Sequence, residues 1–197
     1  MPCFVCKAFF IAFLKGESET EEKIIVDSKT MFRSLARLSH EIIESDPDAD
    51  AVYLIGIKRR GVPLAAIIKE NIERFSDIKV FLGKLDITLY RDDLTERYDK
   101  PRVNDSEIGF DVNGKDIILV DDVIFTGRTA RAAMDAVISL GRPSRIRLAV
   151  MIDRGHRELP ISANYVGKNI PTSRDEFIGV RVDEFDGANE VVLVKNG

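Results

Sequence analysis

The chain has 197 residues, which is enough for one domain with a substantial hydrophobic core. Hydrophobic residues make up 45% and charged residues 31% of it, with 13 Gly and 7 Pro, so collagen, coiled coil and wholesale disorder are excluded. With 29 Lys and Arg against 33 Asp and Glu, the net charge is −4, and any affinity for nucleic acid must come from a local basic patch.

The first 22 residues differ from the rest of the chain. They hold both cysteines, Cys3 and Cys6, and an apolar run, Ala8–Leu14, that is far shorter than the roughly 20 residues of a membrane span. No further Cys or nearby His completes a zinc site, and two cysteines make no disulfide framework. We therefore predict a cytoplasmic protein without membrane contact, with an N-terminal tail over 1–22 and one domain over 23–197.

The first predicted helix follows Asp27, a residue type that favours the N-cap, and ends near Ser45. Its apolar residues recur at helical spacing, and a basic stripe recurs on the opposite side. The apolar positions are Met31, Leu35, Leu38 and Ile42, and the basic ones are Arg33, Arg37 and His40.

Strand-length apolar runs then alternate with amphipathic helices. Residues 51–57 form a continuous apolar run, which is typical of a strand buried on both faces of a parallel sheet. This alternation predicts an α/β domain with a mainly parallel central sheet flanked by helices. The remaining predicted strands lie at 24–26, 79–90, 117–120, 146–152, 165–166, 178–182 and 191–194, and the remaining helices at 62–75 and from 128 to Gly141, with Ala130, Ala133, Met134, Val137 and Ile138 as an apolar face.

Between these elements, residues 91–116 are polar and show no sustained period. Structureless segments longer than about 12 to 15 residues are typical of active-site lids or of disorder, and a short hairpin at the two ends is compatible with both interpretations.

The segment 117–129 carries the strongest functional signal. A predicted buried strand delivers two carboxylates, Asp121 and Asp122, at its carboxyl end, where α/β sheets bind ligands. The loop Thr126–Thr129 then opens a helix, whose free N–H groups and positive dipole favour a phosphate. The pattern indicates a ligand that places hydroxyl groups or a metal about one sugar ring away from a phosphate.

Other phosphate sites fit less well. A P-loop needs G-x-x-x-x-G-K-[ST], but Gly83-Lys84 precedes Leu85 and Gly114-Lys115 precedes Asp116. The stretch 56–61 lacks the G-x-G-x-x-G of a dinucleotide site. A plain capped turn with solvated acids stays open as the structural alternative.

Residues 117–129 resemble the phosphoribosyl pyrophosphate (PRPP) signature of type I phosphoribosyltransferases. Three further segments, 86–93, 153–160 and 167–172, are similar to the PyrR family of bifunctional pyrimidine-operon attenuators with uracil phosphoribosyltransferase activity. The resemblance spans about 23–194. It implies a type I phosphoribosyltransferase fold with a small base-binding hood and a long flexible loop.

The resemblance implies roles for individual residues. Asp121 and Asp122 would contact the ribose hydroxyls as catalytic groups, and Arg91 would act from a loop that closes over PRPP. Mg²⁺ would be bound mainly through PRPP, with no dedicated protein metal site. Arg59 and Arg60 match the diphosphate-contacting loop; their structural alternative is a solvated turn, and that of Arg91 is an exposed ion pair. The residues assigned to PRPP and the nucleotide are Arg59, Arg60, Asp121, Asp122, Val123, Ile124, Phe125, Thr126, Gly127, Arg128 and Thr129.

Phe125 distinguishes the sequence from purine phosphoribosyltransferases, which commonly carry an acid at this position. An aromatic ring offers a packing surface and cannot handle a ring proton, so uracil is favoured over hypoxanthine or guanine. Arg154 and Val180 resemble base-side positions of the family, although Arg154 could instead pair with a carboxylate. A purine phosphoribosyltransferase without RNA binding stays as the alternative.

A second function is expected in RNA binding. The family binds leader mRNA of pyrimidine operons in response to UMP or UTP, and a homodimer or higher oligomer could present a continuous cationic surface. A regulator that keeps the pocket only as a nucleotide sensor is the alternative to an active enzyme, and surface arginines can simply be solvated. The predicted RNA-binding residues are Arg33, Arg37, His40, Arg142, Arg145, Arg147, His156 and Arg157.

Overall fold

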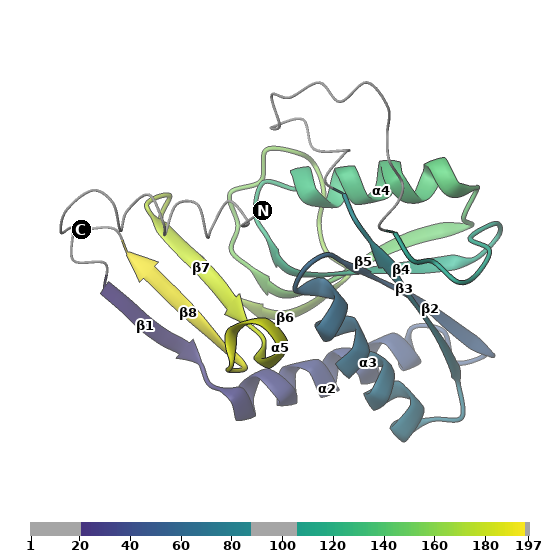
Figure 1. Ribbon diagram of the computed structural model, residues 1–197, viewed down its shortest axis with the longest axis horizontal. Coiled ribbons are helices and arrows are strands. Elements are labelled where there is room, and N and C mark those ends of the chain that lie inside the picture. Colours follow the sequence, from purple (N-terminus) through teal and green to yellow (C-terminus); the bar gives the residue numbers. More distant parts are fainter. Residues whose placement is uncertain (1–20, 88–105, 196–197) are drawn as a thin grey trace.

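The computed structural model describes residues 21–87 and 106–195, and in it the chain forms two sheets (Figure 1). One sheet has five parallel strands in the order β3-β2-β4-β5-β6, and the other has three antiparallel strands in the order β1-β8-β7. The elements are β1 (Glu21–Val26), α2 (Ser28–Glu44), β2 (Ala51–Ile57), α3 (Gly61–Phe75), β3 (Lys79–Leu85), β4 (Asp116–Ile124), α4 (Arg128–Leu140), β5 (Arg145–Asp153), β6 (Tyr165–Asn169), β7 (Glu176–Arg181), α5 (Asp183–Asp186) and β8 (Glu190–Lys195).

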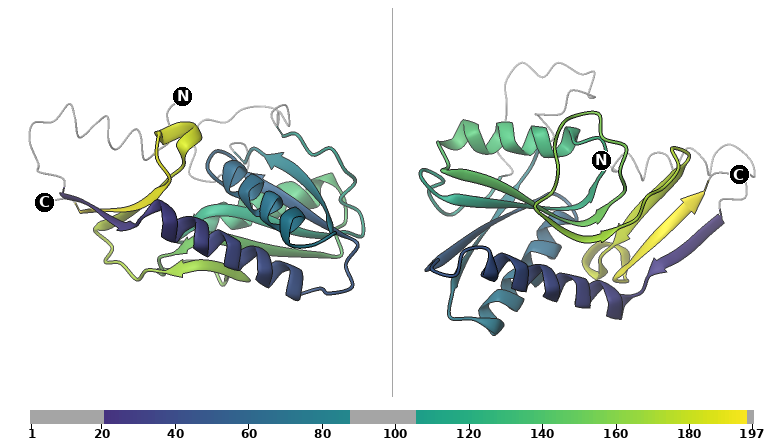
Figure 2. Two further views of the ribbon diagram at one scale, coloured as in Figure 1. Left: turned by 90° about the horizontal axis from the view of Figure 1, so that it is seen from below. Right: turned by 180° about the vertical axis from the view of Figure 1, so that it is seen from behind.

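The parallel sheet lies between α2 and α3 on one face and α4 on the other (Figures 1 and 2). Its central strand β4 alternates between two hydrophobic clusters: Ile118 and Val120 pack on the side of α2 and α3, and Ile117 and Leu119 on the side of α4. Burial on both faces explains the continuous apolar runs of the sequence. The α/β class and the parallel sheet are confirmed, and β2 has the predicted bounds.

The N-cap and the buried face of α2 agree with the prediction. The Asp27 carboxylate accepts a hydrogen bond from the Thr30 N–H at 2.8 Å, which satisfies one of the unpaired donors of the first turn. Met31, Leu35, Leu38 and Ile42 are all buried. The helix therefore has its basic stripe facing away from the core.

The smaller sheet starts earlier than the predicted domain boundary. Glu21 and Glu22, which we assigned to the tail, pair in β1 with Lys195 and Val194 of β8. The backbone pairing with β8 sets this boundary, and a side-chain pattern does not show it. Residues 1–20, with Cys3 and Cys6, lie outside the described residues.

The segment before β4 returns alongside β3. Lys84 and Glu107 exchange two backbone hydrogen bonds, at 3.0 and 2.9 Å, in an antiparallel bridge. This isolated bridge lies where we expected a short hairpin, but it joins residue 107 to β3 and is not a pair of strands within 91–116. The first part of that segment, residues 91–105 with Arg91, lies outside the described residues.

The start of α3 packs directly on β4 because residue 61 is a glycine. A Cβ atom added at Gly61 would lie 2.2 Å from the carbonyl oxygen of Val120, which no side chain can tolerate. This close approach brings the turn Lys58–Arg60 next to the carboxyl end of β4.

Helix α4 is rotated slightly from its predicted face. Ile138 is 58% exposed, although we predicted that it faces the core, and Ala132 and Ala136 are buried instead. The small alanine side chains let the helix lie close to the sheet, and periodicity alone did not distinguish the two faces. Within residues 21–87 and 106–195, we find no helix long and apolar enough to cross a membrane.

Candidate functional site

The two predicted carboxylates lie at the carboxyl end of β4, still within the strand. The strand runs to Ile124 because its ladder with β5 continues to the Ile124–Asp153 pair, so the end that we predicted for this strand, at residue 120, was wrong. The Asp121 carboxylate accepts the Asp122 N–H at 2.9 Å, and the Asp122 carboxylate accepts the Val123 N–H at 2.8 Å. These short-range bonds fix both acids at the sheet edge.

Burial changes the electrostatics of this pair. Desolvation raises the pKa of Asp122 above the ordinary aspartate value, although the Val123 N–H and the nearby positive charge of Arg60 act to lower it. Asp121 is 9% exposed. Two acids held in this environment are costly to fold, which favours a functional origin.

The phosphate-loop candidate follows directly. Gly127 has a φ of 91° and stands at the N-cap of α4, where no side chain caps the helix. The Thr126 carbonyl accepts the N–H groups of Glu158 and Leu159, each at 3.0 Å. Residues 158–159 therefore brace the loop from one side. The Arg128 N–H at the start of α4 donates to the Thr126 hydroxyl at 3.3 Å, and the positive end of the helix dipole lies at this loop.

Arg157 provides a second brace, which the sequence did not indicate. Its guanidinium donates to the carbonyl oxygens of Phe125 at 2.9 Å and Ile161 at 2.9 Å, and to the Asp153 carboxylate at 2.5 Å. The Arg157 guanidinium therefore uses these donors in hydrogen bonds to the loop around the site. RNA contact for Arg157 stays a prediction, and within the protein its donors hold the loop.

Arg59 and Arg60 lie in the turn that Gly61 brings next to β4. The Arg60 guanidinium binds both carboxylate oxygens of Asp186 on α5, at 2.8 and 3.1 Å, and that of Arg59 lies 5.9 Å from the Phe185 ring centroid. The turn is thus held against the smaller sheet, and the solvated-turn alternative does not describe Arg60. Asp186 and Phe185 carried no signal in the sequence.

Phe125 and Arg154, which we predicted on the base side, lie against each other. The Arg154 guanidinium lies 4.1 Å from the Phe125 ring centroid, and the His156 ring approaches the same ring edge-on at 6.1 Å. Arg154 is 5% exposed and donates to Thr172, Ser173 and Glu176. Its pKa is lowered by desolvation, against the raising effect of Glu176.

The acceptors of Arg154 exclude one alternative. They are the Thr172 hydroxyl and the backbone carbonyls of Ser173 and Glu176, so the guanidinium is not paired with a carboxylate. Val180, in contrast, does not line this wall. It is 1% exposed within the core cluster under the smaller sheet, and our base-side assignment for it was wrong.

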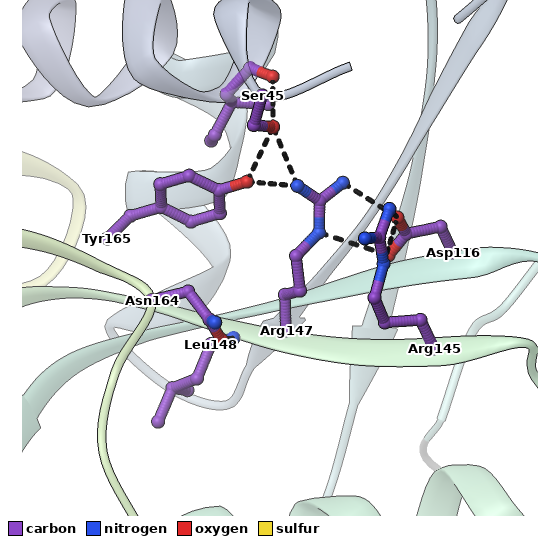
Figure 3. A network of polar contacts seen from close by, with 8 residues as sticks. Ser45, Asp116, Arg145, Arg147, Leu148, Asn164 and Tyr165 are labelled. Carbon is purple, nitrogen blue, oxygen red and sulfur yellow. Dashed lines mark hydrogen bonds and ion pairs between the residues drawn. The ribbon is translucent and has the colours of Figure 1, made fainter.

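Arg147 is a structural residue and not an RNA-facing one. Its side chain is 10% exposed; it binds both oxygens of Asp116, at 3.1 and 2.8 Å, and the Ser45 hydroxyl at 2.6 Å, and it contacts the Tyr165 hydroxyl (Figure 3). The predicted RNA contact is contradicted because every edge of the guanidinium is engaged inside this network. Arg145, which is 55% exposed, binds the same Asp116 from the outside.

The other predicted RNA-binding residues lie in three places on the chain, and their RNA contacts stay predictions. Arg142 and Arg145 precede or open β5, whereas His156 follows its end, so the nine-residue strand separates them by about 30 Å at about 3.3 Å per residue. Arg33, Arg37 and His40 do share the outer side of α2. Arg37 pairs with Glu41 and donates to the carbonyls of residues 166 and 167 on β6.

His40 belongs to an ordered aromatic stack. Its ring lies 4.3 Å from that of Phe75 at an angle of 11°, and the Arg74 guanidinium lies 4.8 Å from the Phe75 ring centroid. The outer side of α2 therefore presents positive charge next to an aromatic surface at the end of α3.

Within residues 21–87 and 106–195, no group of three or more His, Cys, Asp or Glu side chains is arranged to hold a metal ion. The two acids at the end of β4 could contact a cation only together with other ligands. This arrangement is compatible with a Mg²⁺ ion whose remaining ligands come from a bound diphosphate and from water.

Comparison with known proteins identifies the family. The family model described as "Phosphoribosyl transferase domain" matches residues 21–184. The chain is 57% identical over 171 residues to "Bifunctional protein PyrR" of Caldicellulosiruptor bescii, covering 87% of this chain and 94% of that protein. It is 56% identical over 172 residues to the protein of the same name from Clostridium novyi, covering 87% and 97%.

Solved structures show the same fold at low sequence identity. Hypoxanthine phosphoribosyltransferase of Trypanosoma cruzi superposes with a TM-score of 0.67 at 18% identity, covering 89% of this chain and 97% of that one. A hypoxanthine-guanine phosphoribosyltransferase from Bacillus anthracis gives 0.64 at 19%, covering 90% and 99%. With the acid pair and the phosphate loop in place, the chain belongs to the PyrR family of bifunctional proteins and carries a phosphoribosyltransferase domain.

Proposed function

We propose that this protein transfers the phosphoribosyl group of PRPP to uracil, forming UMP and diphosphate, and that the same pocket controls RNA binding by sensing UMP or UTP. The observation that carries the enzymatic part is the placement of Asp121 and Asp122 at the end of β4, immediately before the loop 126–129. Membership of the PyrR family supports the choice of uracil.

The geometry suits a reaction in which positioning and charge neutralisation supply most of the catalysis. Asp121 and Asp122 would bind the ribose hydroxyls, and the N–H groups of 126–129 would hold the 5′-phosphate. The bond between C1 and the diphosphate oxygen breaks while uracil N1 bonds to C1 and releases its proton. Arg59 and Arg60 would neutralise the departing diphosphate, and the negative acids would stabilise the oxocarbenium-like centre.

The base wall favours a pyrimidine. Phe125 offers an aromatic face, 37% exposed, and Arg154 lies against it with Nε and Nη2 bound to hydroxyl and backbone oxygens. Neither residue can accept a ring proton. A purine phosphoribosyltransferase would need an acid where Phe125 stands, so that alternative is not favoured.

Removal of Mg²⁺ tests how the metal is held. When bound with PRPP, Mg²⁺ supplies positive charge to the diphosphate. Because Asp121 and Asp122 alone cannot complete a coordination shell, we expect a chelator to abolish UMP formation but to change UMP affinity by less than about twofold. Calorimetry with UMP, with and without chelator, checks this. Loss of UMP binding on chelation would contradict it and would indicate a protein-held metal.

RNA binding is assigned to the outer side of α2. Arg33 and His40 are exposed there, and the His40 ring stacks on the Phe75 ring. RNA is commonly bound through phosphate contacts and stacking on aromatic side chains. Arg37 belongs to the same side, but its bonds to β6 would mix structural and binding effects in a variant. UMP made or bound in the pocket would act as the effector.

The variant Arg33→Ala with His40→Ala is expected to lower affinity for a pyrimidine-operon leader RNA about tenfold and to reduce the salt dependence by about one ion. Filter binding at several salt concentrations, with UMP present, measures both. Arg131→Ala on α4, across the sheet, is the matched control (Figure 2). Unchanged RNA affinity in the double variant, with UMP formation intact, would contradict this surface assignment.

The proposal includes a cytoplasmic location and a homodimer or higher homo-oligomer. Both rest on the resemblance to the PyrR family, in which PRPP, uracil and leader mRNA are the partners.

A further inference from the structure

The short helix α5, next to the smaller sheet, contacts the turn 58–60, which is proposed to bind diphosphate. Arg60 donates from Nε to Asp186 Oδ2 at 3.1 Å and from Nη2 to Oδ1 at 2.8 Å, while the Arg59 guanidinium lies over the Phe185 ring. The two side chains of this pair are only 21% and 19% exposed. Two consecutive arginines are therefore held by two consecutive residues that lie 126 positions further along the chain.

Asp186 occupies one of the two edges of Arg60 through which a phosphate group could be bound side by side. A guanidinium presents two parallel N–H donors along its Nε/Nη2 edge, and these fit the two oxygens of a carboxylate or of a phosphate group equally well. With Nε and Nη2 both bonded to Asp186, a phosphate group cannot take the same bidentate position. Asp186 and diphosphate compete for one set of donors.

The Asp186 carboxylate also keeps a hydrogen bond when Arg60 moves away from it. Its Oδ2 accepts a second hydrogen bond, from the Val182 N–H at 3.0 Å, at the start of α5. Burial raises the pKa of Asp186, but the bonds from Arg60 and Val182 outweigh it, so the net pKa is below the ordinary value and the group is ionised at neutral pH. When Arg60 leaves, the carboxylate keeps the Val182 N–H and gains water.

We propose that Asp186 is a placeholder for diphosphate: it holds Arg60 in the unliganded protein and is displaced when the diphosphate of PRPP arrives. This inference rests on the proposed phosphoribosyl transfer and deepens it. It gives Asp186 a positioning role, in which the carboxylate keeps the turn 58–60 ordered and lowers the apparent affinity for diphosphate. Binding of diphosphate then frees α5 from the turn.

If Asp186 is a placeholder, replacing it increases the affinity for diphosphate. If its contact with Arg60 only stabilises the turn, replacing it lowers that affinity. In Asp186→Asn the carboxylate charge is gone, while the side-chain oxygen can still accept the Val182 N–H. We expect this variant to bind inorganic diphosphate and PRPP, both with Mg²⁺, about two- to fivefold more tightly, because a partly exposed ion pair no longer competes. Calorimetry on the full chain measures this. Glu184→Gln, an exposed site on the same helix with the same charge change, is the control and should bind like the wild type.

Arg60→Gln completes the test. Alone it should weaken diphosphate binding at least about tenfold, and adding Asp186→Asn to it should change nothing further. Weaker binding in Asp186→Asn, or equal tightening in Glu184→Gln or in the Arg60→Gln background, would overturn the placeholder. If Asp186→Asn does not fold, Asp186→Ser, which keeps an acceptor, gives the same comparison.

The experiments distinguish an error in the role proposed for Asp186 from an error in the proposed enzymatic function. If Arg60→Gln binds diphosphate normally while the wild type still forms UMP, the placeholder is overturned and the transferase stands. If the wild type binds neither PRPP nor diphosphate, the transferase itself is wrong.

Discussion

Replacing Asp122 by Asn is expected to lower kcat/KM for UMP formation by about 10²- to 10³-fold while the folded protein becomes more stable. The loss follows because the variant removes the carboxylate charge that would face the reacting ribose at the end of β4. Asp121→Asn should lower kcat/KM by a similar factor. The double variant should have a kcat/KM no more than about tenfold below that of either single variant, since the two acids act on one ribose. Steady-state kinetics with PRPP and uracil measures these losses.

The gain in stability follows from the sign of the pKa shift. Desolvation raises the pKa of Asp122 in the folded state, so the folded protein binds its proton more tightly than the unfolded chain does. The contribution of this group is then favourable at low pH and is lost as the pH rises through the raised pKa, which leaves an unfavourable buried charge at neutral pH. Asp122→Asn removes that charge.

Thermal unfolding at pH 7 should therefore show a higher Tm for Asp122→Asn, by about 2–4 °C for each kcal/mol relieved, and the gain should vanish below about pH 4. Asp135→Asn, an exposed acid on α4, is the control and should leave both Tm and turnover unchanged. An Asp122→Asn protein with normal turnover would remove the main support for the site. A lower Tm at pH 7 would show that its hydrogen bond to Val123 outweighs desolvation.

Replacing Arg147 by Met is expected to lower the free energy of unfolding by about 2–4 kcal/mol. The guanidinium joins β4, β5, β6 and the end of α2 through Asp116, Tyr165 and Ser45, and its loss leaves the Asp116 carboxylate half-paired and two hydroxyls without their shared donor (Figure 3). Methionine keeps the bulk of the side-chain stem. Urea unfolding measures the change.

Arg145→Met provides the matched comparison, because Arg145 binds the same Asp116 but is 55% exposed. It should cost less than about 1 kcal/mol, as exposed ion pairs do. Equal costs for the two variants would contradict the assignment of Arg147 as the structural member, and would leave either arginine available for RNA.

The elements of the fold could be predicted where a local signal sets them. Residues 51–57 form the predicted strand because a run of seven apolar residues buries both faces, and Asp27 caps α2 because its side chain reaches the Thr30 N–H. The extension of β4 to Ile124 could not be predicted, because its pairing with β5 sets where that strand ends. The start of β1 at Glu21 likewise depends on its partner β8.

The candidate site was predictable in its contiguous part only. Asp121, Asp122 and the loop 126–129 follow one another in the chain, so their chemistry can be read as a motif. The brace by Arg157 and the grip of Asp186 on Arg60 join residues 32 and 126 positions apart, and no pattern of spacing signals them. Charge patterning also failed for Arg147, because an arginine on a strand looks the same in the sequence whether it faces solvent or a buried carboxylate.

Product formation with Mg²⁺, PRPP and one base at a time tests the central claim most directly. Uracil, hypoxanthine, guanine and orotate are offered separately, and the nucleotide is identified by chromatography. The acid pair, the phosphate loop and Phe125 together predict UMP from uracil and no product from the other three bases. Formation of a purine nucleotide, or of no nucleotide from any base, would contradict the assignment of this pocket as a uracil phosphoribosyltransferase site.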